Sequence, residues 1–253
     1  MRRVVLWLVT VLAIASFSLS PADAKNLARS PRQAASWLPG SIPATAVKSR
    51  RPPDDIRAKY PWLDGQATVR MQFTGGLPFE VTVYGDHAPV TAGNFIDLAS
   101  RGFYDGAELV VDKPFLLKVV TPEYAPNQTP RNIPLEIQPE GSAKISYGET
   151  FRDSLIDDFV QPVLKNSFRG SIALSHPVGQ PNAGSTQLMI SYGNGQLIPF
   201  NGNELDGNYA VFAYIAEGIN YREPSVDVLE NVRSGDRLEK VEVISGLENL
   251  HRP

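Results

Sequence analysis

Short β-forming segments separated by turn signals recur about every 10 to 15 residues between residues 66 and 244. Residues 66–73 and 79–84 alternate apolar and polar side chains on either side of Gly75 and Gly76, which is the pattern of a β-hairpin. Further strand candidates follow at residues 109–120, 133–138, 170–175, 186–191, 210–215 and 238–244. Many short strands with few helices favour a mainly β fold, as a closed or nearly closed barrel.

Two segments depart from this pattern and predict helices at the ends of the barrel. Residues 88–101 place apolar side chains at helical spacing, with Pro89 suited to a first turn and Gly102 to the end. Residues 226–232 also place apolar side chains at helical spacing and predict a second, shorter helix. His87 directly precedes the first helix and is predicted to be a surface cap.

The composition removes several classes of function. The chain has 253 residues, no Cys and three His. Disulfides, Cys-ligated zinc, iron–sulfur clusters and thiol catalysis are therefore excluded, and a His-rich metal site is not expected. The P-loop, nucleophile-elbow and HExxH motifs do not occur in the sequence.

The N-terminus has the layout of a secretory signal peptide. Arg2 and Arg3 precede an apolar stretch over residues 4–17, and small residues at Ala22 and Ala24 suit a signal peptidase. We expect residues 1–24 to be removed on export. The alternative is an uncleaved membrane anchor, for which the apolar stretch is short.

Charge divides the rest of the chain into two parts. Residues 25–63 hold eight Lys or Arg against two Asp and are rich in Pro, which predicts a basic, extended arm or linker. Residues 64–253 hold 14 Lys or Arg against 24 Asp or Glu, so the expected folded domain, residues 64–250, is acidic and would repel nucleic acid. The arm could contact an anionic lipid surface, an acidic partner or the domain itself, and a solvated linker is the competing interpretation.

Six motifs in order along the chain resemble those of cyclophilins. They include residues 88–95 (APVTAGNF), 170–175 (GSIALS), 182–190 (NAGSTQLMI) and 205–212 (LDGNYAVF). The resemblance covers about residues 66–247. It implies an eight-stranded antiparallel barrel capped by two helices, a proline-containing polypeptide client and no cofactor or metal.

A closer resemblance is to the thylakoid-lumen cyclophilin-like proteins of plants and cyanobacteria, which are linked to photosystem II assembly. Residues 131–137 (RNIPLEI) and 243–250 (VISGLENL) are similar to theirs. Those relatives carry an N-terminal helical domain where this chain has the arm, so that domain's function is not carried over. The expected location is an extracytoplasmic space, either periplasm or thylakoid lumen.

The resemblance also assigns the groove, one position at a time. Cyclophilins use an Arg to donate to the prolyl nitrogen as the amide twists, and that position falls on Val111, which cannot donate. Residues 109–120 contain no Arg, and Arg101 and Arg131 are the obvious substitutes. The family's Trp becomes Glu204, its Gln becomes Lys118 and its His becomes Tyr209. The implied groove residues are Phe115, Lys118, Leu174, His176, Gln187, Met189, Leu205 and Tyr209.

Two hypotheses follow. The first is a peptidyl-prolyl isomerase acting on the folding of exported proteins, with catalysis impaired by Val111, because losing one preorganised donor costs about 10²–10³ in rate. On this hypothesis Val111→Arg raises activity. The second is a non-catalytic binding module or assembly chaperone, with photosystem II as one candidate client. The sequence does not indicate an oligomeric state.

Overall fold

The computed structural model describes residues 50–113, 115–121, 131–154, 156, 160–192, 204–216, 228–229 and 231–253. The predicted signal peptide and most of the predicted arm lie outside these residues. Of the helix predicted at residues 226–232, residues 226, 227 and 230 also lie outside them, and residues 228–229 have 3-10 conformation. Within the described residues, no helix has the length and apolar character needed to cross a membrane.

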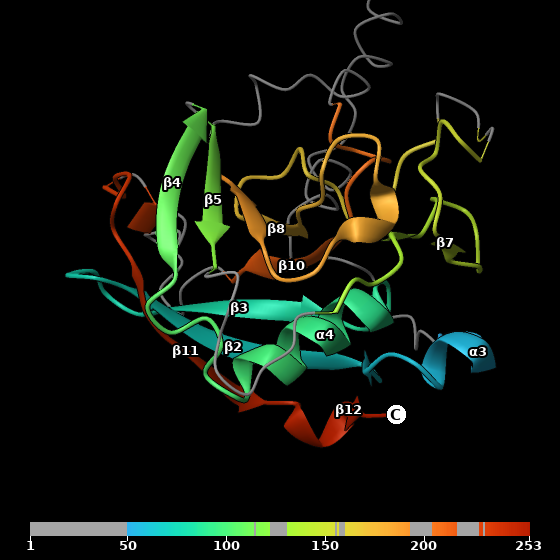
Figure 1. Ribbon diagram of the computed structural model, residues 1–253, viewed down its shortest axis with the longest axis horizontal. Coiled ribbons are helices and arrows are strands. Elements are labelled where there is room, and N and C mark those ends of the chain that lie inside the picture. The colour runs from blue at the N-terminus through green and yellow to red at the C-terminus, as the bar shows by residue number, and fades with distance from the viewer. Residues whose placement is uncertain are drawn as a thin grey trace, which may run out of the picture. The chain divides into compact units, whose positions relative to one another are not determined.

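One antiparallel sheet of eight strands forms the body of the domain (Figure 1). Its order is β11-β2-β3-β10-β8-β9-β5-β4. The strands are β2 (Gln66–Phe73), β3 (Phe79–Tyr84), β4 (Glu108–Lys113), β5 (Leu116–Val120), β8 (Ser171–Leu174), β9 (Leu188–Ser191), β10 (Val211–Ile215) and β11 (Leu238–Ser245). The predicted mainly β fold with an eight-stranded antiparallel sheet is confirmed, and each strand of the sheet falls inside a predicted segment or extends at most one residue beyond it.

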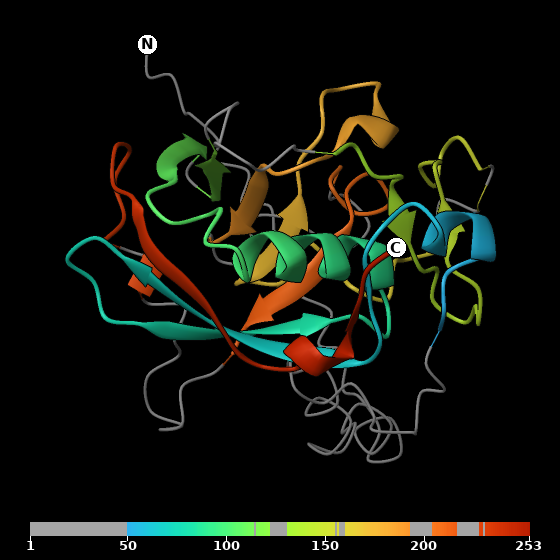
Figure 2. The same ribbon diagram turned by 60° about the horizontal axis from the view of Figure 1, so that its bottom comes forward.

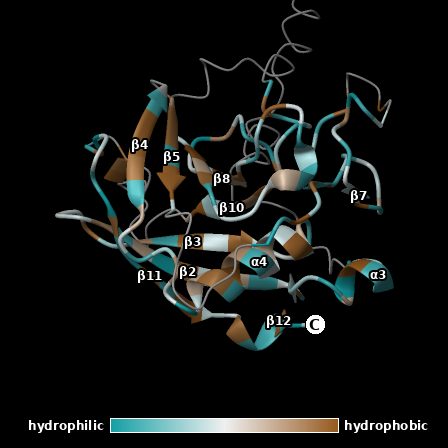
Figure 3. Cartoon of the chain, in the orientation of Figure 1, coloured by the Kyte–Doolittle hydropathy of each residue, from teal (hydrophilic) through white to brown (hydrophobic). Residues whose placement is uncertain are grey.

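The sheet curls until its two edge strands meet at one end. Glu108 at the start of β4 forms a bridge with Arg237, which precedes β11. Beside this bridge, the Leu109 amide donates to the Asp236 carbonyl at 2.7 Å, and the Leu238 amide donates to the Ala107 carbonyl at 2.8 Å. In the described residues the edge contact is confined to this end, so the sheet is a half-open barrel. Figure 3 shows apolar residues concentrated along β4, β5 and β10.

Helix α4 (Pro89–Ala99) lies across the sheet (Figure 2), and all of its residues are buried. Pro89 occupies the first turn as predicted, and Gly102, with a φ of 68°, follows the end of the helix. The helix is buried all round because it packs against β3, β10 and β11 and also against β1 (Trp62–Leu63) and β12 (Leu250–His251). At Gly93 a Cβ would lie 2.3 Å from the Trp62 Cα, so only glycine allows β1 to approach this closely.

The last residues of the predicted arm belong to the folded domain. Helix α3 (Asp54–Arg57) is followed by β1, which pairs with β12 so that Trp62 lies opposite His251, with the two rings stacked 4.2 Å apart. The 3-10 helix η5 (Leu247–Asn249) leads into β12. Pairing of β1 and β12 ties the two ends of the domain together, which neither segment indicates by itself.

The segment between β5 and β8 forms a small annex beside α4. Strands β6 (Glu136–Ile137) and β7 (Ser146–Tyr147) pair, and Leu135, Ile137 and Phe151 pack with Ala210 in a separate apolar cluster. A further 3-10 helix, η2 (Pro181–Ala183), lies between β8 and β9. The annex therefore has its own small core, and it contacts the N-terminal end of α4, where the Val90 and Thr91 amides donate to Glu136.

Candidate functional site

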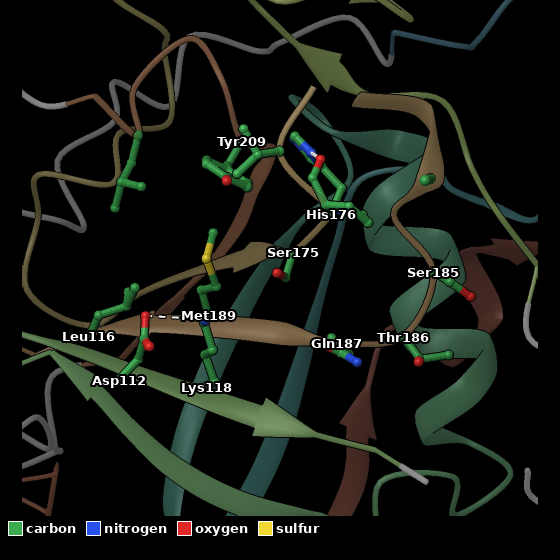
Figure 4. Close-up of a pocket in the computed structure, with 14 residues that line it drawn as sticks. Asp112, Leu116, Lys118, Ser175, His176, Ser185, Thr186, Gln187, Met189 and Tyr209 are labelled. Atoms are coloured by element: carbon green, nitrogen blue, oxygen red, sulfur yellow. Dashed lines mark hydrogen bonds and ion pairs between the residues drawn. The ribbon is translucent and has the colours of Figure 1, made fainter. Parts of the chain in front are cut away.

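A pocket of about 580 Å³ opens between the β4–β5 hairpin, β9 and two loops (Figure 4). Met189 of β9 and Leu116 of β5 give it apolar surface, and Tyr209 and His176 stand together on one wall. Ser175, Ser185, Thr186 and Gln187 add polar groups. An apolar surface with a few polar groups around it is the usual composition of a ligand-binding pocket.

Six of the eight groove residues expected from the sequence line this pocket. They are Lys118, His176, Gln187, Met189, Leu205 and Tyr209. Phe115 and Leu174 are not among the lining residues. Phe115 precedes β5, whose lining side chains are the alternate residues Leu116 and Lys118, and Leu174 is buried against Gly184, where a Cβ would lie 2.9 Å from its Cδ2.

Asp112, rather than Val111, faces the pocket from β4. Val111 pairs with Leu117 and Lys113 pairs with Leu116, so Asp112 is an extra residue in the ladder, as in a β-bulge. A bulge re-aims a side chain relative to simple alternation. Val111, the position that the resemblance gives to the catalytic Arg, is therefore half-buried outside the pocket lining, and its neighbour Asp112 faces the pocket instead.

Asp112 forms an ion pair with Lys118 inside the pocket. The Lys118 Nζ lies 3.1 Å from the Asp112 Oδ2, and the two side chains are 36 % and 35 % exposed. Among the described residues that line the pocket there is no Arg, and the formal charges of Lys118 and Asp112 cancel. The charged side chains of the pocket therefore form a neutral pair.

The two candidate substitutes for the missing Arg are engaged elsewhere. Arg101 and Arg131 both bind the Asp97 carboxylate, and Arg252 binds it as well, with its Nε 2.8 Å from the Asp97 Oδ1. Asp97 is buried in α4. The three arginines therefore tie α4, the annex and the C-terminal segment together.

Ring stacking and contacts with backbone carbonyl groups hold the pocket wall that His176 and Tyr209 form. The rings of His176 and Tyr209 stack with centroids 4.4 Å apart. The His176 ring nitrogens face two carbonyl oxygens, that of Pro177 at 2.9 Å and that of Asn208 at 2.8 Å. Because a carbonyl only accepts, the ring donates to one of them as a neutral imidazole and to both only when doubly protonated.

A helix residue fixes the polar side of the pocket. The Asn94 Nδ2 of α4 donates to the Ser185 carbonyl at 2.8 Å, and the Thr186 hydroxyl bonds to the Thr121 hydroxyl at 2.7 Å. Asn94 therefore ties α4 to the loop that lines the polar side of the pocket. The sequence did not predict that Asp112 and Leu116 line the pocket, nor the hydrogen bond from Asn94 to Ser185. Alternation of side chains along the strand from Lys118 could have indicated Leu116, but no local signal indicated the bulge at Asp112.

A second polar cluster lies at the start of α4, away from the pocket. The Glu136 carboxylate accepts from the amides of Val90 at 3.1 Å and Thr91 at 2.9 Å, and burial raises its pKa to about 7. His87 is buried rather than a surface cap, because Gln138 of the annex bonds to its ring at 2.8 Å and covers it. Burial lowers the pKa of His87. No group of three His, Cys, Asp or Glu suited to a metal ion occurs in the described part of the chain.

Comparison with known proteins matches residues 68–246 to a family described as cyclophilin type peptidyl-prolyl cis-trans isomerase/CLD. A protein of Synechocystis sp. named as a thylakoid lumen peptidyl-prolyl cis-trans isomerase, sll0408, is 36 % identical over 76 % of this chain. The chloroplastic peptidyl-prolyl cis-trans isomerase CYP38 of Arabidopsis thaliana is 33 % identical over 79 % of it. The chain spans about half the length of these two relatives, 51 % and 47 %. A crystal structure of a Cryptosporidium parvum cyclophilin covers 70 % of this chain and 99 % of its own, with a TM-score of 0.47 and 16 % identity.

Proposed function

Because the chain belongs to the cyclophilin-type peptidyl-prolyl cis-trans isomerase family, we propose that its pocket binds proline-containing polypeptide segments and isomerises them only slowly. The observation that carries this proposal is the pocket itself. It keeps Gln187 and the apolar floor of Met189 and Leu205, but among its described lining residues no Arg is present.

The chemistry explains why binding and catalysis separate here. Rotation about the X–Pro amide has a barrier of about 18–20 kcal/mol, set by resonance of the nitrogen lone pair with the carbonyl. A catalyst lowers that barrier by binding the twisted amide better than either planar form. A donor aimed at the prolyl nitrogen does this, whereas an apolar floor binds cis, trans and twisted forms about equally well. Loss of the donor therefore lowers the rate and leaves affinity for proline segments.

A non-catalytic binding module or assembly chaperone is the second candidate. The Asp112–Lys118 pair favours it, because the one ammonium among the described pocket-lining residues is already neutralised. Photosystem II assembly is the client process we propose for this case, from the resemblance to lumenal cyclophilin-like proteins.

We place the protein in the thylakoid lumen in preference to the periplasm. One relative is named as a thylakoid lumen protein and the other as chloroplastic. Export through residues 1–24 and contact of the basic arm with an anionic membrane surface belong to the same proposal. Fractionation of the source cells, with N-terminal sequencing of the purified protein, tests both the compartment and the cleavage site.

Exchange spectroscopy on proline peptides tests the activity. NMR measures the cis–trans exchange rate of an Ala-Pro peptide with and without the protein, and chemical shifts of Gln187 and Met189 report binding in the same sample. We expect those resonances to shift while the exchange rate rises little. If the protein accelerates cis–trans exchange as much as an ordinary cyclophilin measured under the same conditions, the pocket must hold another hydrogen-bond donor for the prolyl nitrogen.

A further inference from the structure

The Asp112–Lys118 ion pair lies on the wall of the pocket, where a bound segment would meet it. Lys118 stands opposite Met189 in the β5–β9 ladder, and in Figure 4 its side chain runs beside Met189. Asp112 comes from β4, the edge strand beyond β5, and lies on the Leu116 side of the pair. A ligand seated over Met189 would therefore lie next to Lys118, with Asp112 one strand farther along the sheet.

The pair is weak enough for a ligand to replace it. Both side chains are about one third exposed, and the distance of 3.1 Å is that of a single contact. An exposed ion pair of this kind shifts an equilibrium by no more than about fivefold, because water and salt screen it. The ammonium also has three N–H donors, of which Asp112 takes one.

We propose that this pocket selects proline segments that carry an acidic side chain next to the proline. Lys118 is the residue that binds the ligand carboxylate, and Asp112 is its competitor within the chain. This inference rests on the proposed function, since it needs a proline segment over Met189. Asp112 thereby keeps Lys118 occupied when the pocket holds a neutral segment and is displaced by an acidic one.

The opposite preference, for a basic neighbour that binds Asp112, fits the geometry less well. Asp112 lies one strand farther from Met189 than Lys118 does, and a cation bound to it would also lie beside the Lys118 ammonium. Like charges repel at that approach. The order of the strands thus favours an acidic neighbour.

Peptide titration of the full chain tests the proposal. Three blocked tetrapeptides that differ only in the residue before proline, Glu, Gln or Lys, are titrated by NMR at low and high salt. The variants are Asp112→Asn, Lys118→Met and, as a control, Glu80→Gln. Glu80 lies outside the pocket lining and pairs with Arg70 at the same distance of 3.1 Å, so its substitution changes the net charge equally.

We expect the wild type to bind the Glu peptide about two- to fivefold more tightly than the Gln peptide at low salt. Asp112→Asn should widen this ratio, Lys118→Met should abolish it with the Gln peptide unaffected, and Glu80→Gln should leave it unchanged. The inference is wrong if the Gln peptide binds but Asp112→Asn gives the Glu peptide no advantage, or if the Lys peptide binds best. If no proline peptide shifts Gln187 or Met189 in any variant, the proposed function fails and the inference with it.

Discussion

Replacement of Asp97 by Ala should destabilise the domain far more than loss of an ordinary surface ion pair. The Asp97 side chain is 5 % exposed and accepts from Arg101, Arg131 and Arg252, which come from three separate parts of the chain. A charge-assisted hydrogen bond contributes about 1.5–3 kcal/mol, and breaking a buried pair costs about 3–5 kcal/mol. The three arginines are 29–53 % exposed, so water partly replaces the lost contacts. We therefore expect a loss of about 2–4 kcal/mol.

Urea unfolding followed by far-UV circular dichroism measures this loss as a lower midpoint with an unchanged slope. In a chain of this size the melting temperature should fall by about 5–15 °C. The matched control is Glu80→Ala, which breaks an exposed pair with Arg70 and should cost about 0–1 kcal/mol. Equal losses for Asp97→Ala and Glu80→Ala would refute the argument that burial and convergence of three arginines make Asp97 a structural centre.

Three further predictions follow from single positions. Gly93→Ala should abolish or severely reduce folded protein, since its Cβ would lie 2.3 Å from the backbone of β1; soluble expression with a native melting temperature would contradict this. The contribution of Glu136 to stability should fall as pH rises from about 5 to 7.5. Burial raises the folded-state pKa of this carboxyl from 4.5 to about 7, so the folded state retains a proton that the unfolded chain releases. The difference between wild type and Glu136→Gln in urea isolates this contribution, which we expect to be on the order of 2–3 kcal/mol, and a difference independent of pH would exclude it. Finally, Asp112→Arg combined with Lys118→Gln should raise the rate of proline isomerisation by about tenfold or more, because the bulge aims position 112 into the pocket. Val111→Arg combined with Lys118→Gln should not raise it. Equal cis–trans exchange rates for the two double variants would argue against this assignment of position 112.

Much of the fold was predictable because its signals are local. The hairpin of residues 66–84 follows from side chains that alternate around a Gly–Gly turn, and α4 follows from helical spacing between Pro89 and Gly102. Ordered motifs then predicted the eight-stranded antiparallel sheet and six residues that line the pocket. These features depend on neighbours in the chain, or on a family pattern that the chain retains.

Only the tertiary structure decided what fills the site and what holds the domain together. The bulge that turns Asp112 into the pocket arises from the register of β4 against β5, which no local pattern of residues 109–120 specifies. The pairing of β1 with β12 and the convergence of three arginines on Asp97 join residues far apart in the chain. Such contacts depend on how a curled sheet brings distant segments together. The resemblance to cyclophilins could therefore assign the Arg position to Val111, but it could not show that Asp112 is the residue that faces the pocket.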